Sequence, residues 1–324
     1  NNQLSIIILG GTSFLGPHQI KYALARGHKV SIFTRGKTKP SVNSEVFNKI
    51  EQLVGDRENN LTALENRKWD VVIDNSGRNV EWTKKTAQLL KDNCELYVYT
   101  SSTGVYFPYM TSDINESKEV LMKMPENLED EVLKMEYGYG VMKANSEQET
   151  IKAFGKERSI IVRPTYMFGP GDKTNRFIHW PVRLAKGGDV MVPGKKEDLV
   201  QYADVRDVAE FMIRLAENKI TGKFNIAGPI NQQTMLDFVN EAKNAFNVDS
   251  KIVSVDDYDF LEKNGVYYLV PWIPPTGKNY GSSRAANKKA IAAGLTFRDL
   301  KTSVKEMHNW WYSDAITQKQ RDNF

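Results

Sequence analysis

The sequence predicts an α/β protein with a doubly wound parallel sheet and a smaller C-terminal lobe. Two features predict this class. Short apolar runs alternate with helical patterns along the first half of the chain, and a glycine-rich turn follows the first apolar run directly. Alternating strands and helices indicate a parallel sheet joined by right-handed crossovers. The second half is less regular, which favours a separate lobe there.

The predicted strands are short, mainly apolar runs bounded by glycine or polar residues. They lie at 4–9, 29–33, 69–73, 95–99 and 158–162. The helices are predicted from apolar residues spaced three and four apart, at 17–26, 80–91, 139–154, 206–217, 235–246 and 303–313. Gly27 ends the first of these helices. The proline-rich stretch 271–275 is expected to be a loop.

The composition argues against several classes of partner. A 40% hydrophobic content in 324 residues is enough for a large buried core. The formal net charge of +4 is small for this length, so we expect no nucleic-acid partner. No apolar run reaches about 18 residues, so we expect no membrane partner. The single cysteine, Cys94, excludes an internal disulfide, and the four histidines lack metal-ligand spacing, so we expect no metal site.

The turn 10–16, Gly-Gly-Thr-Ser-Phe-Leu-Gly, stands between the first strand and the first helix, where a phosphate-binding turn belongs. Gly10 permits the tight turn, and Gly16 is expected to let the helix pack close to the sheet. The free N–H groups of the helix N-terminus suit a pyrophosphate. Ser13 replaces the usual middle glycine, where its small hydroxyl could donate to a phosphate. The alternative is an ordinary glycine-rich turn.

The residues after the second strand indicate which dinucleotide is bound. An NAD enzyme normally places a carboxylate here for the ribose diol, whereas this chain has Thr34, Arg35 and Lys37. Two cations beside a hydroxyl suit a 2′-phosphate, so NADP is favoured, with NAD as the alternative. The alternative interpretation is that Arg35 and Lys37 are solvated turn residues that do not bind the cofactor.

Polar residues also follow two other strands of the predicted sheet. Asp56 is a candidate acceptor for the adenine amino group, or a loop acid without a role. Asn75, Ser76 and Gly77 end a further strand, where small polar residues can approach the cofactor ribose.

Tyr139 and Lys143 are four residues apart in a predicted helix, so they share one face. A nearby ammonium and an oxidised nicotinamide both favour the phenolate, which lets a tyrosine act as acid or base near neutrality. Upstream, a strand ends in Ser101, Ser102 and Thr103, and a hydroxyl there can hold the substrate oxygen. We assign this role to Ser102, with Thr103 second and Ser101 third.

With these motifs the sequence resembles the extended short-chain dehydrogenase/reductases, the NAD-dependent epimerase/dehydratase family, in a divergent epimerase-like branch. The matching segments are 10–16, 101–106, 139–143, 163–172, 202–209 and 224–228. They occur in the family's order over most of the chain, so joint coincidence is very improbable.

The resemblance implies a Rossmann-type domain formed by residues 1–168, with residues 198–228 also belonging to it. It also implies a smaller C-terminal substrate lobe, made of 169–197 and 229–324. The implied reaction is hydride transfer on a carbohydrate, either a sugar or a nucleotide sugar, by an epimerase or an oxidoreductase. A homodimer is common in the family.

The resemblance also assigns roles to the candidate residues. Tyr139 would be the acid/base, Lys143 would hold the ribose, and Ser102 would bind the reacting oxygen. The residues expected to contact the cofactor are Gly10, Thr12, Ser13, Phe14, Leu15, Gly16, Thr34, Arg35, Lys37, Asp56, Asn75, Ser76, Gly77, Thr100, Lys143 and Pro164. Those expected to contact the substrate are Thr103, Tyr106, Arg176 and Trp272.

Two departures from the family pattern concern the substrate. Sugar-nucleotide 4,6-dehydratases usually have Asp-Glu after the active-site hydroxyl residue, and here Thr103 and Gly104 stand there, so dehydration of that kind is not expected. The segment 107–136 carries eight acids against three lysines. It is either a solvated surface excursion or a lid beside the active site. Its charge disfavours a diphosphate, so a neutral sugar or polyol fits better than a nucleotide sugar.

The competing hypothesis is a catalytically silent dinucleotide-binding sensor or an RNA-associated protein, because some relatives with this kind of glycine turn associate with RNA in chloroplasts. The complete set of Ser102, Tyr139 and Lys143 argues against it. The chain begins without Met, so we expect that a preceding segment was removed. The expected location is cytoplasmic, and the alternative is export in the folded state after loss of an N-terminal signal.

Overall fold

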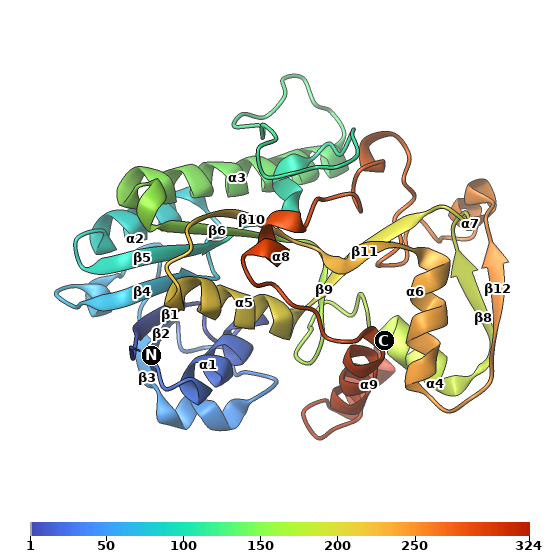
Figure 1. Cartoon of the computed structure of the whole chain (residues 1–324), viewed down its shortest axis with the longest axis horizontal. Coiled ribbons are helices and arrows are strands. Elements are labelled where there is room, and N and C mark those ends of the chain that lie inside the picture. Colours follow the sequence, from blue (N-terminus) through green and yellow to red (C-terminus); the bar gives the residue numbers. More distant parts are fainter. Residues whose placement is uncertain (1) are drawn as a thin grey trace.

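Seven parallel strands form the central sheet of the computed structural model, which describes residues 2–324 (Figure 1). Their order across the sheet is β10-β6-β5-β4-β1-β2-β3. The strands are β1 (Ser5–Leu9), β2 (Lys29–Thr34), β3 (Glu51–Val54), β4 (Trp69–Asp74), β5 (Cys94–Thr100), β6 (Ser159–Pro164) and β10 (Gly222–Ile226). The chain order reverses between β1 and β4, which opens a crevice at the carboxyl ends of these strands.

Helices cover both faces of this sheet, which confirms the predicted doubly wound parallel architecture. On β1, Ile6 and Ile8 pack into one apolar layer, whereas Ile7 and Leu9 pack into the other. Successive side chains of a strand point to opposite faces, so a strand covered on both sides is apolar throughout. The helices pair as α1 (Leu15–Ala25) with α5 (Val205–Glu217), and as α2 (Val80–Leu90) with α3 (Glu131–Phe154).

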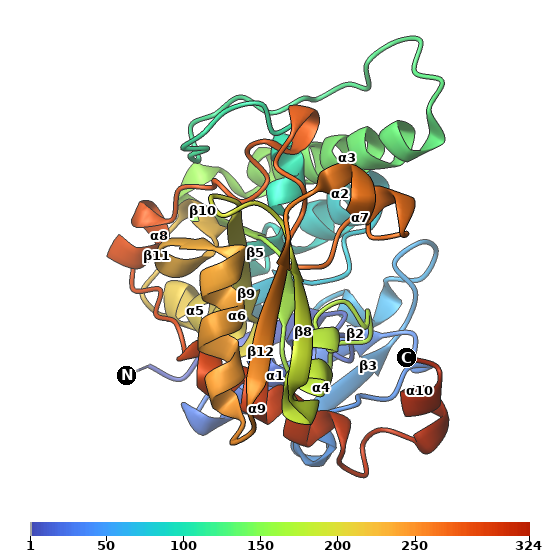
Figure 2. The ribbon, with the colours of Figure 1, turned by 90° about the vertical axis from the view of Figure 1, so that its right-hand side faces the viewer.

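A smaller lobe with its own core stands beside the sheet (Figure 1) and faces the viewer in Figure 2. Its buried centre includes Trp180, Phe238 and Trp272. Its strands are β7 (Met167–Phe168), β8 (Gly188–Pro193), β9 (Leu199–Asp204), β11 (Gly228–Thr234) and β12 (Ser250–Val255). Its helices are α4 (His179–Lys186), α6 (Met235–Ala242), α7 (Tyr258–Lys263), α9 (Leu300–Trp311) and α10 (Gln318–Asp322). The short helix α8 (Lys288–Ala292), although late in the sequence, packs on β10, and its Ala290 joins the core of the central sheet.

Helix α3 is longer than the sequence predicted. It begins at Glu131 rather than at Tyr139, and the side chain of Asp130 caps it by accepting from the N–H groups of Val132 and Leu133. The first two turns extend beyond the sheet, so Val132 and Met135 are exposed. Without a buried face these turns lack the apolar periodicity on which the prediction depended.

A buried polar network joins α3 to the sheet behind the crevice. The guanidinium of Arg163 on β6 donates to both carboxylate oxygens of Glu147 on α3, at 2.9 and 2.6 Å. Arg163 also donates to the hydroxyl of Tyr106 at 2.8 Å, and that hydroxyl donates to Asn225 on β10 at 2.7 Å. All four side chains are buried. The network fixes the position of α3, which carries two of the candidate catalytic residues.

We predict that Arg163→Met lowers the free energy of unfolding by about 3–5 kcal/mol, because it leaves the Glu147 carboxylate buried without its cation. The midpoint of urea unfolding measures this loss. The matched control is Lys134→Met, which removes an exposed partner of Glu131 and should leave the midpoint almost unchanged. Equal shifts in the two variants would show that the buried pair does not hold α3.

Candidate active site

Tyr139 reaches the end of β5 because two glycines allow α3 to approach it closely. A Cβ atom on Gly140 would lie 2.5 Å from the carbonyl oxygen of Gly104, and a Cβ on Gly104 would lie 2.9 Å from the Tyr139 ring. Gly104 belongs to the short 3-10 turn Thr103–Tyr106, which directly follows Ser102. The tyrosine ring therefore rests on the turn that begins with the candidate hydroxyl residue.

Ser102 and Ser101 have different environments. The Ser102 Oγ accepts a hydrogen bond from the Gly104 N–H at 2.9 Å and lines the cleft described below, so its own proton is free to be donated. The Ser101 hydroxyl is buried and donates to Glu147 at 2.5 Å. This difference supports Ser102 over Ser101 as the residue that binds a substrate oxygen.

Lys143 is held by backbone and by aromatic rings. Its Nζ donates to the carbonyl oxygen of Thr100 at 3.0 Å and lies 5.1 Å from the centroid of the Tyr99 ring and 5.9 Å from that of Tyr139. Burial lowers the pKa of Lys143 to about 8. The amine is therefore mostly protonated at neutral pH, and its charge favours a phenolate on the same helix face.

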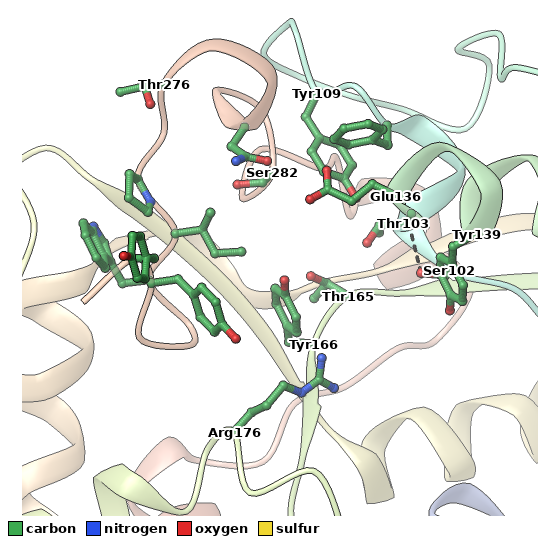
Figure 3. Close-up of a pocket in the computed structure, with 18 of the residues that line it drawn as sticks. Ser102, Thr103, Tyr109, Glu136, Tyr139, Thr165, Tyr166, Arg176, Thr276 and Ser282 are labelled. Carbon is green, nitrogen blue, oxygen red and sulfur yellow. Dashed lines mark hydrogen bonds between the residues drawn. The ribbon is translucent and has the colours of Figure 1, made fainter. Parts of the chain in front are cut away.

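A cleft of about 830 Å³ opens in front of these residues (Figure 3). Its walls come from the ends of β5 and β6, from α3, and from the loops and helix α7 of the smaller lobe. Tyr139, 47% exposed, faces it, and its hydroxyl makes no hydrogen bond to any residue within 2–324. Aromatic side chains are frequent in the lining: Phe107, Tyr109, Tyr139, Tyr166, Tyr258, Tyr267 and Tyr268.

The first part of the acidic segment 107–136 is a fixed wall of this cleft. The N–H of Tyr109 donates to the carbonyl of Lys278 at 2.7 Å, and the N–H of Gly281 donates back to Tyr109 at 2.8 Å. Further along, the buried Ile114 donates from its N–H to the carbonyl of Arg284 at 3.0 Å. Residues 107–114 are therefore anchored to the smaller lobe, whereas most residues from 115 to 130 are exposed.

The glycine-rich turn has the shape that a pyrophosphate needs. Gly10 has φ +82°, a left-handed conformation that favours glycine, and a Cβ there would lie 2.9 Å from the Cβ of Ser76. A Cβ on Gly11 would lie 2.4 Å from Ile32 of β2, and one on Gly16 would lie 2.2 Å from the Gly11 carbonyl oxygen. Gly11 therefore lets the turn lie close to β2, and Gly16 lets the start of α1 lie close to the turn.

The N-terminus of α1 has no side-chain cap. The helices α2, α3 and α5 around the same sheet are capped by Asn79, Asp130 and Asp204. At the start of α1, Phe14 provides no capping hydrogen bond, and the first turn carries no acid. The Ser13 hydroxyl donates to the Gly10 carbonyl at 3.0 Å, so it closes the turn. The free N–H groups of this helix fit an anionic ligand, which makes the turn a suitable holder for a dinucleotide.

The other predicted cofactor residues lie at the same edge of the sheet, because they follow the carboxyl ends of parallel strands. Arg35 and Lys37 are exposed after β2, and the Thr34 hydroxyl accepts from the Gly36 N–H at 3.1 Å. Asp56 accepts from the Glu58 N–H at 2.8 Å. The rest of the predicted set lies in the turn after β1 and at the ends of β4, β5 and β6: Thr12, Leu15, Asn75, Ser76, Gly77, Thr100 and Pro164.

A buried ion pair beneath this edge was not predicted. The guanidinium of Arg57 binds both oxygens of Asp74 at the end of β4, and Tyr97 donates to the same carboxylate at 2.5 Å. Burial would raise the pKa of Asp74, but the charge of Arg57 outweighs it and the pKa is lowered. Arg57 also donates to the Ser76 hydroxyl at 3.2 Å, so the pair supports a residue that touches the glycine turn.

Two of the four residues predicted to contact the substrate are buried in the structure. Trp272 is 0% exposed, and its indole N–H donates to Asp198 at 2.9 Å within the core of the smaller lobe. Tyr106 is 3% exposed and belongs to the Arg163 network. Thr103, Arg176 and the buried Trp272 are among the residues that line the cleft, whereas Tyr106 is not.

The sequence prediction missed most of the lining residues, among them Tyr109, Glu136 and Tyr166. Glu136 had a signal, because it precedes Tyr139 by three residues and so shares its helix face.

Within residues 2–324, no three His, Cys, Asp or Glu side chains are grouped as metal ligands. No helix formed by these residues is both long and apolar enough to cross a bilayer.

Comparisons with known proteins give a consistent result. The profile described as the NAD dependent epimerase/dehydratase family matches residues 6–227. The chain is 29% identical over 245 residues to the chloroplast stem-loop binding protein of 41 kDa b from Arabidopsis thaliana, covering 70% of this chain and 60% of that protein. It is 28% identical over 244 residues to a decarboxylating sterol-4-alpha-carboxylate 3-dehydrogenase of Candida albicans, covering 68% and 66%. It therefore spans less than two thirds of the length of these two relatives.

Among solved structures, the chain is similar to the UDP-N-acetylglucosamine 4-epimerase from Bacillus cereus, with a TM-score of 0.69 and 19% identity. The match covers 96% of this chain and 100% of that one. At this identity the similarity establishes the shared fold, including both the central sheet and the smaller lobe.

We predict that Gly16→Ala weakens dinucleotide binding by about tenfold or more, because the new Cβ would force the turn away from a helix whose free N–H groups are expected to bind the phosphates. Fluorescence titration with NADPH and with NADH measures the affinity. Gly138→Ala is the matched control, since its Cβ would meet nothing nearer than the Met124 sulfur at 3.9 Å. Wild-type affinity in Gly16→Ala would argue that the dinucleotide does not bind at this turn.

Proposed function

Because the chain belongs to the NAD-dependent epimerase/dehydratase family, we propose that it transfers a hydride between a nicotinamide dinucleotide and a carbinol carbon of a carbohydrate, as an epimerase or an oxidoreductase. The observation that supports this most directly is the juxtaposition of Tyr139, Lys143 and Ser102 at the sheet edge that carries the uncapped glycine turn. The Arabidopsis and Candida relatives differ in their named roles, so the site must decide the function.

The roles of the three side chains follow from their positions. Ser102 donates its free proton to the reacting oxygen of the substrate and fixes its orientation. As the substrate hydroxyl becomes a carbonyl, Tyr139 accepts the hydroxyl proton, and in the reverse direction it returns this proton to the oxygen. The Lys143 ammonium, buried between Thr100 and the two tyrosine rings, stabilises the phenolate form of Tyr139.

A bound nicotinamide would supply the hydride acceptor and donor that either reaction needs. An oxidoreductase would exchange the dinucleotide after each turnover, whereas an epimerase would retain it. In either case, Lys143 would also hold the ribose, and the free N–H groups of α1 would hold the pyrophosphate. The exposed cations Arg35 and Lys37 favour NADP over NAD, because they suit a 2′-phosphate.

A carbohydrate substrate is supported by the character of the cleft. Its lining combines tyrosine rings, which can stack on sugar rings, with side chains that can hydrogen-bond hydroxyl groups, among them Thr103, Thr165 and Asn279. The structurally similar epimerase from Bacillus cereus is named for a sugar nucleotide, which agrees with a sugar-type substrate.

A dinucleotide-binding sensor or RNA-associated protein is the second candidate. The observation in its favour is the name of the Arabidopsis relative, a stem-loop binding protein. A protein that only binds a dinucleotide or RNA would not need Tyr139, Lys143 and Ser102 together at a cleft. Their arrangement therefore favours the hydride-transfer proposal.

Tyr139→Phe tests the proposal directly. The variant keeps the ring against Gly104 and removes only the hydroxyl, so turnover should fall by roughly 10²–10⁴-fold while dinucleotide affinity stays close to wild type. Turnover is measured with a panel of sugars and sugar nucleotides, by absorbance for net reduction and by product analysis for epimerisation. Unchanged biological activity in this variant would favour the sensor or RNA-associated role.

The dinucleotide itself can be identified by mass spectrometry of the small molecule released when the purified protein is denatured, and we expect NADP or NADPH. We predict that Arg35→Ser weakens NADPH binding by roughly tenfold to a hundredfold, as expected for loss of a charged hydrogen bond, and leaves NADH binding unchanged. Lys39→Ser, an exposed cation farther along the same loop, is the control. Release of NAD, with no change in Arg35→Ser, would replace NADP by NAD in the proposal.

A further inference from the structure

The charged side chains that line the cleft are mostly acidic. Carboxylates come from Glu136, Asp259 and Glu262, and the single guanidinium comes from Arg176. Glu136 lies on α3, whereas Asp259 and Glu262 lie on α7, so acids face the cleft from two sides. An excess of negative charge around a substrate site repels anions and favours ligands that donate hydrogen bonds.

Of the residues that the structure describes, Arg176 is the one cationic side chain in the cleft lining that could bind a phosphate. Its Nε donates to the Thr174 hydroxyl at 3.1 Å, and its guanidinium lies over the Tyr166 ring at 4.9 Å. Figure 3 shows it below Tyr166, on the side of the cleft away from Glu136. A diphosphate is usually held by several cations or N–H groups that converge on both phosphates, and only this cation lines the cleft among residues 2–324.

Glu136 lies one helical turn before Tyr139, on the same face of α3. Its carboxylate makes no hydrogen bond to any residue of the described chain, and neither does the hydroxyl of Tyr109 beside it. Burial raises the pKa of Glu136, against the opposing effect of Lys278. The Tyr109 backbone is fixed by its two hydrogen bonds to 278–281. Two polar groups with free hydrogen-bonding capacity therefore lie on a rigid wall, within the same cleft as the reacting residues.

We infer that Glu136, with Tyr109 beside it, is a specificity-determining residue that binds a hydroxyl or ammonium group of a carbohydrate without phosphate. This inference rests on the proposed hydride transfer and adds the substrate class. The carboxylate accepts hydrogen bonds from the substrate at a position away from the reacting carbon, while Ser102 and Tyr139 hold the reacting oxygen. A sugar nucleotide would place its diphosphate in a cleft with three carboxylates and one guanidinium.

The test compares three probes on the dinucleotide-loaded protein: glucosamine, methyl glucoside and UDP-glucose. Affinities are measured by ligand-observed NMR at low ionic strength, where surface charges act most strongly. In the wild type we expect glucosamine and methyl glucoside to bind more tightly than UDP-glucose. In Glu136→Gln we expect glucosamine affinity to fall about tenfold, as for loss of a hydrogen bond to a charged group, and UDP-glucose affinity to rise.

Opposite changes for the two probes separate a role in recognition from damage to the fold, which would weaken both. Glu129→Gln is the matched control, because it removes an exposed acid from the same segment but outside the cleft. Tighter binding of UDP-glucose than of either sugar in the wild type would overturn the inference. Unchanged glucosamine affinity in Glu136→Gln would overturn it as well.

The same samples separate this inference from the proposed function. Turnover of UDP-glucose that depends on Tyr139 would leave the hydride-transfer proposal intact and remove the substrate class inferred here. Loss of dinucleotide binding, by contrast, would remove the proposed function and this inference with it.

Discussion

The close approach of α3 to the turn after β5 determines the geometry of the whole site. A Cβ on Gly140 would stand 2.5 Å from the carbonyl oxygen of Gly104, so only glycine allows the helix to lie so near this turn. One contact thereby sets three relations: the Tyr139 ring rests against Gly104, Ser102 lies at the start of the same turn, and the Lys143 amine reaches the Thr100 carbonyl. The spacing of Tyr139 and Lys143 on one helix would have no chemical meaning without it.

Buried ion pairs maintain this geometry from behind. Arg163 and Glu147 join β6 to α3, and Arg57 and Asp74 lie beneath the glycine-rich turn 10–16. Buried pairs of this kind contribute little net stability compared with apolar packing, but breaking one is costly because a charge is left uncompensated. Their effect is therefore to fix relative position: each couples an element that bears functional residues to the rigid sheet.

The sequence was sufficient to predict those features that depend on residues close together in the chain. The alternation of strands and helices, the turn 10–16 and the pairing of Tyr139 with Lys143 depend on residues close together in the chain, and the predicted fold is confirmed. It was insufficient where distant partners decide. Trp272 lies within the proline-rich stretch 271–275, which is typical of an exposed loop. In the structure its side chain is nevertheless buried in the core of the smaller lobe and donates to Asp198. Tyr106 stands among active-site residues, but Arg163 and Asn225 draw its hydroxyl away from the cleft.

The substrate site shows why a shared fold leaves the substrate open. The sheet edge and α3 supply the candidate reacting groups, whose positions depend on the backbone arrangement of the central sheet and α3. The remaining walls come from segments with little regular structure, such as 107–109 and 276–282, together with the short helix α7. Their side chains can change without altering the sheet, because they do not contribute to its core. The proposed hydride chemistry therefore depends on the most constrained part of the molecule. The acids that face the cleft come instead from Glu136, in the turns of α3 that extend beyond the sheet, and from Asp259 and Glu262 on α7.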